Sequence, residues 1–229
     1  MKGFPTAYTG MVKGKFRPSD DSQIFGFHIP SNAMAVVELR RLGEGLLSET
    51  KSPTFDAPLR NLSLTLASEI EGGIEKYGVV NGMYAYEVDG FGGSVLMDDA
   101  NVPSLLSLPY LGYLSPNNTL YKKTRDFVWS LKNPFFAVGS SAYGIGSPHT
   151  SHYSIWPMSL LQHALTSQSD QEILSDLQVL KTTTANTFFM HESINVNYPD
   201  SFTRSWFTNS PFFLQKVSSY SCLPSLHFC

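Results

Sequence analysis

The sequence predicts an all-α protein. Apolar residues recur at helical spacing in five segments, whereas only residues 83–88, MYAYEV, alternate like a strand. Polar connectors rich in glycine and proline separate the helical segments and carry most of the ionisable residues that could form a site. Functional loops gathered at one end of a helical scaffold are the arrangement of an α/α toroid.

Two helices are expected in the first third of the chain. The first, PSNAMAVVELRRLGEGLL at residues 30–47, has Ser31 or Asn32 as its N-cap. The second, PLRNLSLTLASEIEGGIEKYG, occupies residues 58–78 and stops at Gly78. One apolar face is predicted for each helix: Met34, Val37, Leu42 and Leu46 on the first, and Leu59, Leu62, Leu66, Ile70 and Ile74 on the second.

Three further helices are expected at residues 117–131, 156–167 and 169–184. The last opens with Ser169 and Glu172 in capping-box spacing. No repeat or linker divides the chain, so residues 1–207 are predicted to form one domain. Residues 208–229 lose the periodicity and are expected to form a poorly ordered tail.

Composition excludes several classes of partner. A net charge of -3 and a pI near 6.0 argue against nucleic acid or an anionic membrane surface, since both require a concentrated basic face. The first residues contain no apolar signal-peptide region, and no apolar run approaches the ~20 residues of a membrane span. The two cysteines, Cys222 and Cys229, lie in the last eight residues and cannot form a disulfide framework.

Carboxylates on the connectors are the first candidates for chemistry. Glycoside hydrolysis requires two of them, one to protonate the leaving oxygen and one to activate water or attack. The sequence offers Asp20, Asp21, Glu87, Asp89, Asp98, Asp99 and Glu192. An aspartate before a helix is more often an N-cap, and Asp98 and Asp99 fit that role. Glu192 lies between the apolar Met190 and Ile194, so partial burial is expected.

No metal or cofactor is expected. HTSH places His149 and His152 three residues apart, and His191 is followed by Glu192, but neither continues into HExxH or a third ligand at zinc spacing. The glycine-rich stretches DGFGG and GIGSPH lack the strand-before and helix-after context of a nucleotide loop. No GxSxG nucleophile motif occurs.

Four motifs resemble glycoside hydrolase family 125. They are FRPSDD with IPSNAMAVVELRRL, YAYEVDGFGGSVLMDDANVPSLLSLPYLGY, GIGSPHT with IWPMSLLQHALTS, and MHES with FTRSWF. The resemblance runs from Phe16 to Phe207 and implies an (α/α)6 toroid. It also implies metal-independent, inverting hydrolysis of α-1,6-linked mannose from the non-reducing end of a mannose-containing oligosaccharide or N-glycan.

The resemblance also implies the site residues. Glu192 of the HES motif matches the family's general base, and either Asp20 or Asp21 of RPSDD matches the general acid. The residues expected to bind mannose are Asp98, Asp99, His149, Trp156, His191 and Arg204. Arg204 is alternatively a salt-bridge partner of Glu192.

The chain also departs from the family pattern. Members carry an upstream half with a GDIPAMWLRDS-like motif that does not precede Met1, so about half of the barrel is expected, with weak activity or none. Asn186 and Phe188 replace glycines that are usual before the HES motif. The alternatives are a non-catalytic mannose- or mannan-binding module or pseudoenzyme, and a helical interaction protein without a pocket.

Overall fold

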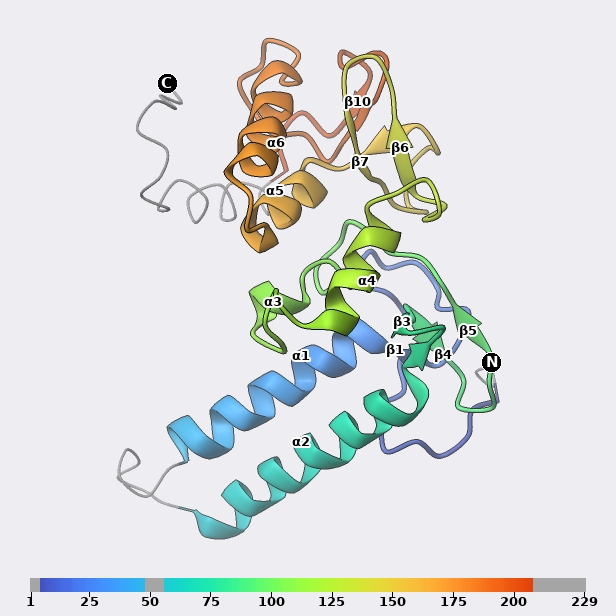
Figure 1. Cartoon of the computed structure of the whole chain (residues 1–229), viewed down its shortest axis with the longest axis vertical. Coiled ribbons are helices and arrows are strands. Elements are labelled where there is room, and N and C mark those ends of the chain that lie inside the picture. The colour runs from blue at the N-terminus through green and yellow to red at the C-terminus, as the bar shows by residue number, and fades with distance from the viewer. Residues whose placement is uncertain (1–4, 48–55, 208–229) are drawn as a thin grey trace. The chain divides into compact units, whose positions relative to one another are not determined.

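The structure, a computed structural model, describes residues 5–47 and 56–207 and divides them into two compact units (Figure 1). Unit 1 comprises the described residues of Met1–Met97 together with Pro103–Arg125. Unit 2 comprises Asp98–Val102 and the described residues of Asp126–Cys229. The predicted tail at residues 208–229 lies outside the described residues.

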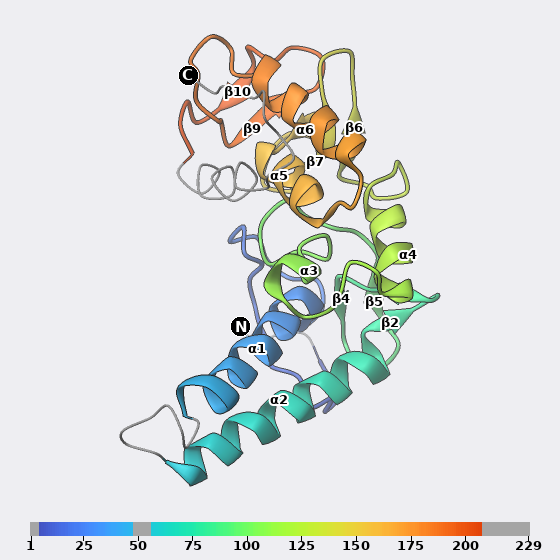
Figure 2. The same cartoon turned by 60° about the vertical axis from the view of Figure 1, so that its left-hand side comes forward.

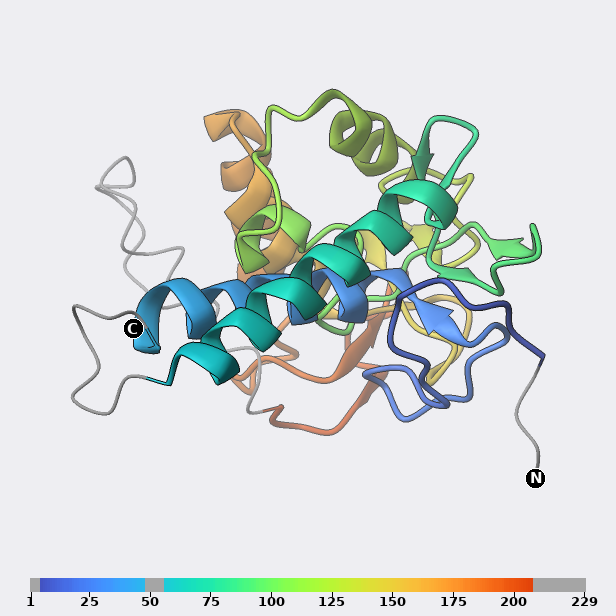
Figure 3. The same ribbon diagram turned by 90° about the horizontal axis from the view of Figure 1, so that it is seen from below.

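Unit 1 is built on an antiparallel pair of helices, α1 (Ile29–Arg40) and α2 (Ala57–Tyr77) (Figures 1, 2 and 3). A short π-helix, η1 (Arg41–Leu46), continues α1. The N-cap of α1 is His28, whose Nδ1 accepts a hydrogen bond from the Ser31 amide at 3.2 Å, so the predicted cap at Ser31 or Asn32 is wrong. Burial, with the nearby Arg17 cation, lowers the pKa of His28 to about 3 and keeps Nδ1 free to accept.

The buried face of α2 differs from the predicted one. Ile70 and Ile74 are buried as expected, but Leu59, Leu62 and Leu66 are exposed. The helix packs instead through small side chains, at Ser63, Ala67 and Gly73. A Cβ atom at Gly73 would lie 2.4 Å from the carbonyl oxygen of Thr9, so only glycine lets that segment approach. The spacing of large apolar residues therefore predicts the wrong buried face for the first half of α2.

Short antiparallel strands complete unit 1. β1 (Phe27–His28), β4 (Glu87–Val88) and β5 (Ser94–Val95) form one sheet in the order β1-β4-β5, with His28 opposite Glu87. β2 (Val79–Val80) and β3 (Met83–Tyr84) form a hairpin whose turn residues, Asn81 and Gly82, both have positive φ. The unit also contains α3 (Leu108–Leu111) and most of α4 (Thr119–Val128).

Unit 2 places two helices beside two small sheets. β6 (Phe136–Val138) pairs with β7 (Tyr143–Ile145), and β8 (Ser154–Ile155), β9 (Ser193–Asn195) and β10 (Phe202–Thr203) form a sheet in the order β10-β9-β8. α5 (Pro157–Thr166) and α6 (Asp170–Thr182) pack as a hairpin (Figure 1). Their shared core includes Ile155, Leu160, Leu161, Leu177, Leu180, Ile194 and Val196.

The all-α prediction, and with it the half toroid made only of helices, is wrong. A helix is present in each of the five expected segments, but the connectors between them form antiparallel sheets. Each strand has only two or three residues, too few to show an alternating apolar pattern by itself. The one alternating segment, residues 83–88, contains β3 and β4, which belong to different sheets. In the part of the chain described, no helix has the length and apolar character needed to cross a membrane.

Candidate functional site

The RPSDD segment forms a tight turn in unit 1. Phe16 and Ser22 form an isolated antiparallel bridge, and inside it the Arg17 amide donates to the Asp21 carbonyl at 2.8 Å. Asp20 lies exposed in this turn with φ of 67°, a left-handed conformation that aspartate tolerates better than most residues. Asp21 is half-buried, and the Ser19 hydroxyl donates to its Oδ2 at 2.7 Å.

Glu192 directly precedes β9 in unit 2. Its amide donates to the Thr203 carbonyl at 3.1 Å, which extends the β9-β10 pairing by one residue and fixes the backbone of Glu192. The residue is 6% exposed, so the predicted burial is confirmed. Its Oε1 lies 3.1 Å from Nε of Arg204, whose side chain is 63% exposed. Among the described residues this is the one ion pair of Glu192, and it matches the second of the two roles expected for Arg204.

Both ring nitrogens of His191 contact backbone carbonyl oxygens. Nδ1 lies 2.9 Å from the Ser205 carbonyl oxygen, and Nε2 lies 3.2 Å from that of Thr184. The buried ring stacks on Phe202 of β10 at 3.7 Å between centroids. This arrangement fixes the residue preceding Glu192 and places both ring nitrogens against protein atoms.

Trp156 lies inside unit 2. Its ring packs with Ala100, Met158 and Phe207, and its Nε1 donates to the Thr150 hydroxyl at 3.0 Å. The side chain is therefore buried, and no open ring face is available for stacking on a sugar. His149 is exposed and lies edge-on to the Trp156 ring, at 6.3 Å between centroids.

Asp98 and Asp99 are fully buried in unit 2. Oδ1 of Asp99 accepts from the amide and the side chain of Asn101, at 2.9 and 2.8 Å, and Oδ2 accepts from the Ser147 hydroxyl at 3.1 Å. No helix begins directly after them in the described chain, so the N-cap alternative is wrong. Asp99 instead holds its own turn against Ser147 of the GIGSPH segment.

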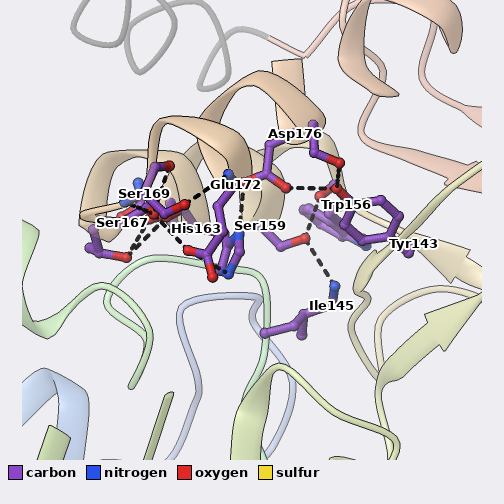
Figure 4. A network of polar contacts seen from close by, with 12 residues as sticks. Tyr143, Ile145, Trp156, Ser159, His163, Ser167, Ser169, Glu172 and Asp176 are labelled. Carbon is purple, nitrogen blue, oxygen red and sulfur yellow. Dashed lines mark hydrogen bonds and ion pairs between the residues drawn. The ribbon is translucent and has the colours of Figure 1, made fainter. Parts of the chain in front are cut away.

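A buried polar network on α5 and α6 was not predicted (Figure 4). Nδ1 of His163 lies 2.7 Å from Oδ2 of Asp176, and the Tyr143 hydroxyl donates to Oδ1 of the same carboxyl at 3.1 Å. The His163 ring stacks on Trp129 at 3.8 Å between centroids. The sequence signal for this pair is weak, because a histidine and an aspartate thirteen residues apart meet only once the two helices fold back on each other.

The candidate residues divide between the two units. Asp20 and Asp21, the candidates for the general acid, belong to unit 1. The candidate general base and all the candidate mannose-binding residues belong to unit 2. Within unit 2, His191, Glu192 and Arg204 lie together on the β9-β10 edge. Trp156 directly follows β8, which pairs with β9, and its ring contacts both His149 and Phe207. Across the described ranges, no three His, Cys, Asp or Glu side chains are grouped so that they could hold a metal ion.

Comparisons with known proteins agree with the motifs. The family model described as metal-independent alpha-mannosidase (GH125) matches residues 1–215. The Meiotically up-regulated gene 157 protein of Schizosaccharomyces pombe is 44% identical over 214 residues, which cover 90% of this chain and 41% of that protein. A solved structure of a Streptococcus pneumoniae metal-independent alpha mannosidase, in a non-productive complex with alpha-1,6-mannobiose, is 37% identical with a TM-score of 0.89. The match covers 94% of this chain and 51% of that one.

The His163–Asp176 network predicts a pH dependence of stability. Burial raises the pKa of the Asp176 carboxyl above its ordinary value of 3.8, although the hydrogen bond with His163 opposes this rise. The folded chain then binds more protons than the unfolded chain at pH values between these two pKa values. The stabilisation that protonated Asp176 provides is therefore lost as pH rises through this window.

We expect the free energy of unfolding of the unsubstituted chain to fall relative to that of Asp176→Asn as pH rises from about 4, by at most about 1.4 kcal/mol per pH unit. All three tryptophans, Trp129, Trp156 and Trp206, lie in unit 2, so urea unfolding followed by tryptophan fluorescence reports on the correct unit. A difference between the two proteins that does not change with pH would contradict this prediction.

Proposed function

The chain belongs to the metal-independent α-mannosidase family GH125, and from that premise we propose that it carries out the inverting hydrolysis of α-1,6-linked mannose at the non-reducing end of a glycan. The observation that carries the proposal is the Glu192 carboxylate, which is buried on a fixed strand edge beside one exposed arginine. The α-1,6-mannobiose in complex with the Streptococcus pneumoniae enzyme supports the substrate class and linkage. The chain spans only 41% and 51% of the length of these two relatives, so their activity is a proposal for this chain.

Glu192 is the proposed general base. The Arg204 cation at 3.1 Å stabilises the ionised carboxylate, and no described side chain other than Arg204 pairs with it, which leaves oxygen lone pairs for a water molecule. In the reaction this water attacks the anomeric carbon while Glu192 takes its proton. The bond between the anomeric carbon and the glycosidic oxygen breaks as that oxygen receives a proton from the general acid.

Asp21 is the proposed general acid. The left-handed backbone at Asp20 gives that residue a structural reason to be aspartate, because aspartate, asparagine and glycine tolerate positive φ. Asp21 does not have positive φ, so its backbone conformation does not explain why this residue is aspartate. Its side chain is half-buried beside Ser19. An inverting mechanism requires the acid and base carboxyl groups to lie about 6.5–9.5 Å apart in the active enzyme, so that water fits between base and sugar.

The remaining candidates are proposed to act in two ways. Exposed His149 and Arg204 are proposed to contact mannose hydroxyls directly. Buried His191 and Trp156 are proposed to hold Glu192 and His149 in place, because their polar atoms are bonded to protein. Asp98 and Asp99 are completely buried, so they are proposed to hold the turn beside Ser147 in place and not to contact mannose themselves.

Glu192→Gln is expected to lower kcat on an α-1,6-mannobioside by about 10²–10⁴-fold, because the amide cannot accept the proton of the attacking water. Binding of mannose, measured by calorimetry, is expected to stay within a few-fold. The exposed Asp200, changed to Asn, is the matched control and should leave both quantities unchanged. A non-catalytic mannose-binding module would bind mannose without turnover before any substitution, and full activity of Glu192→Gln would exclude this residue as the base.

The two adjacent aspartates are each other's control. Asp21→Asn is expected to lower kcat on the mannobioside by about 10²–10⁴-fold through loss of the proton donor. Asp20→Asn is expected to change the rate by less than a few-fold, since asparagine keeps the left-handed turn. The reverse order of losses, measured under the same conditions, would assign the acid to Asp20.

A further inference from the structure

Glu87 makes several buried polar contacts, and the family resemblance assigns no function to this residue. It belongs to β4, pairs with His28 of β1 across the sheet, and is completely buried. Its Oε1 lies 2.6 Å from Nε of Arg17. Its Oε2 accepts hydrogen bonds from the amides of Ile24 and Phe25, at 2.7 and 3.0 Å.

All three donors belong to the segment that carries the proposed acid. Arg17 lies on the chain entering the turn that contains Asp20 and Asp21, and Ile24 and Phe25 lie on the chain leaving it. One carboxylate therefore binds both sides of the same loop. Because Glu87 lies on β4, which pairs with both β1 and β5, it connects the loop to this sheet.

The contacts of the Glu87 carboxylate are charge-assisted hydrogen bonds, which are stronger than hydrogen bonds between neutral groups. A carboxylate removed from water needs charged or backbone donors in place of its lost hydration, and here it has a guanidinium and two amides. Arg17 is buried as well, with its side chain only 5% exposed, so the ion pair helps to stabilise both charged groups away from water. The turn beyond these contacts is short, and Asp20 within it is exposed.

We propose that Glu87 is a positioning residue that holds the RPSDD turn, and with it the proton of Asp21, in the orientation needed to protonate the leaving oxygen. This inference rests on the proposed function, since it assigns Glu87 to the acid half of that reaction. Glu87 does not contact substrate. It acts through the backbone on both sides of the acid.

The test compares two substrates in Glu87→Gln. An α-1,6-mannobioside has a poor leaving group and depends on the acid, whereas α-mannosyl fluoride releases fluoride with little need for protonation. We expect kcat on the mannobioside to fall about 100-fold, the loss typical of a displacement near 1 Å, with little change in KM. We expect kcat on the fluoride to fall less than about threefold, because the base side of the reaction is unaffected.

Two further variants separate positioning from folding. Glu75 of α2 is exposed in the same unit, so Glu75→Gln is the matched control and should change neither rate. The double variant Arg17→Met/Glu87→Gln removes the buried guanidinium together with the carboxylate that it pairs with, so its melting temperature should lie closer to that of the unsubstituted chain while the mannobioside rate stays low. Equal losses on both substrates in Glu87→Gln would overturn the proposal, as would recovery of the mannobioside rate in the double variant.

A measurement without turnover completes the test. Amide hydrogen exchange at Ile24 and Phe25 should be at least tenfold faster in Glu87→Gln than in the unsubstituted chain or in Glu75→Gln. Because glutamine keeps one acceptor oxygen, unchanged exchange would show that the charge of Glu87 does not hold the loop, and this would overturn the inference by itself. If the unsubstituted protein hydrolyses neither substrate, the proposed function fails, and faster exchange then supports only the anchoring of the loop.

Discussion

Each unit of the structure contains a buried glutamate, and burying its carboxylate costs free energy unless protein groups replace the lost water. A buried ionised group is stable only when protein donors replace its hydration, so each buried glutamate organises the chain around it. Glu87 does this in unit 1 with Arg17 and two amides of one loop. Glu192 does it in unit 2 with Arg204 and a strand edge.

The two sites differ in how completely the charge is compensated. Glu87 has strong donors on both oxygens and an arginine that is itself buried, which suits a fixed structural connection. Glu192 has one arginine partner in the described chain, and that arginine is largely exposed. A carboxylate with unused lone pairs can bind and deprotonate water, whereas one with both oxygens occupied cannot. The same chemical group therefore supports a catalytic role in one place and a positioning role in the other.

Local patterns predicted much of this structure. Helical periodicity predicted five helical segments, each of which contains a helix, but it missed α3. The apolar neighbours of Glu192 predicted its burial, and the family resemblance offered the Arg204 ion pair as one of two roles for that residue. Features that depend on distant contacts were missed or wrong. The strands are too short to show alternation, and α2 uses small residues where another segment passes close by. The His163–Asp176 pair and the Glu87 contacts require elements that meet only in the folded chain.

The most direct test of the account is the stereochemistry of the first product. If Glu192 activates water for a single displacement, proton NMR during hydrolysis of an α-1,6-mannobioside should show β-mannose first, with the α-anomer appearing only at the slower rate of mutarotation. Direct appearance of α-mannose would mean a double displacement through a covalent intermediate. That result would contradict the role of Glu192 as a base acting on water.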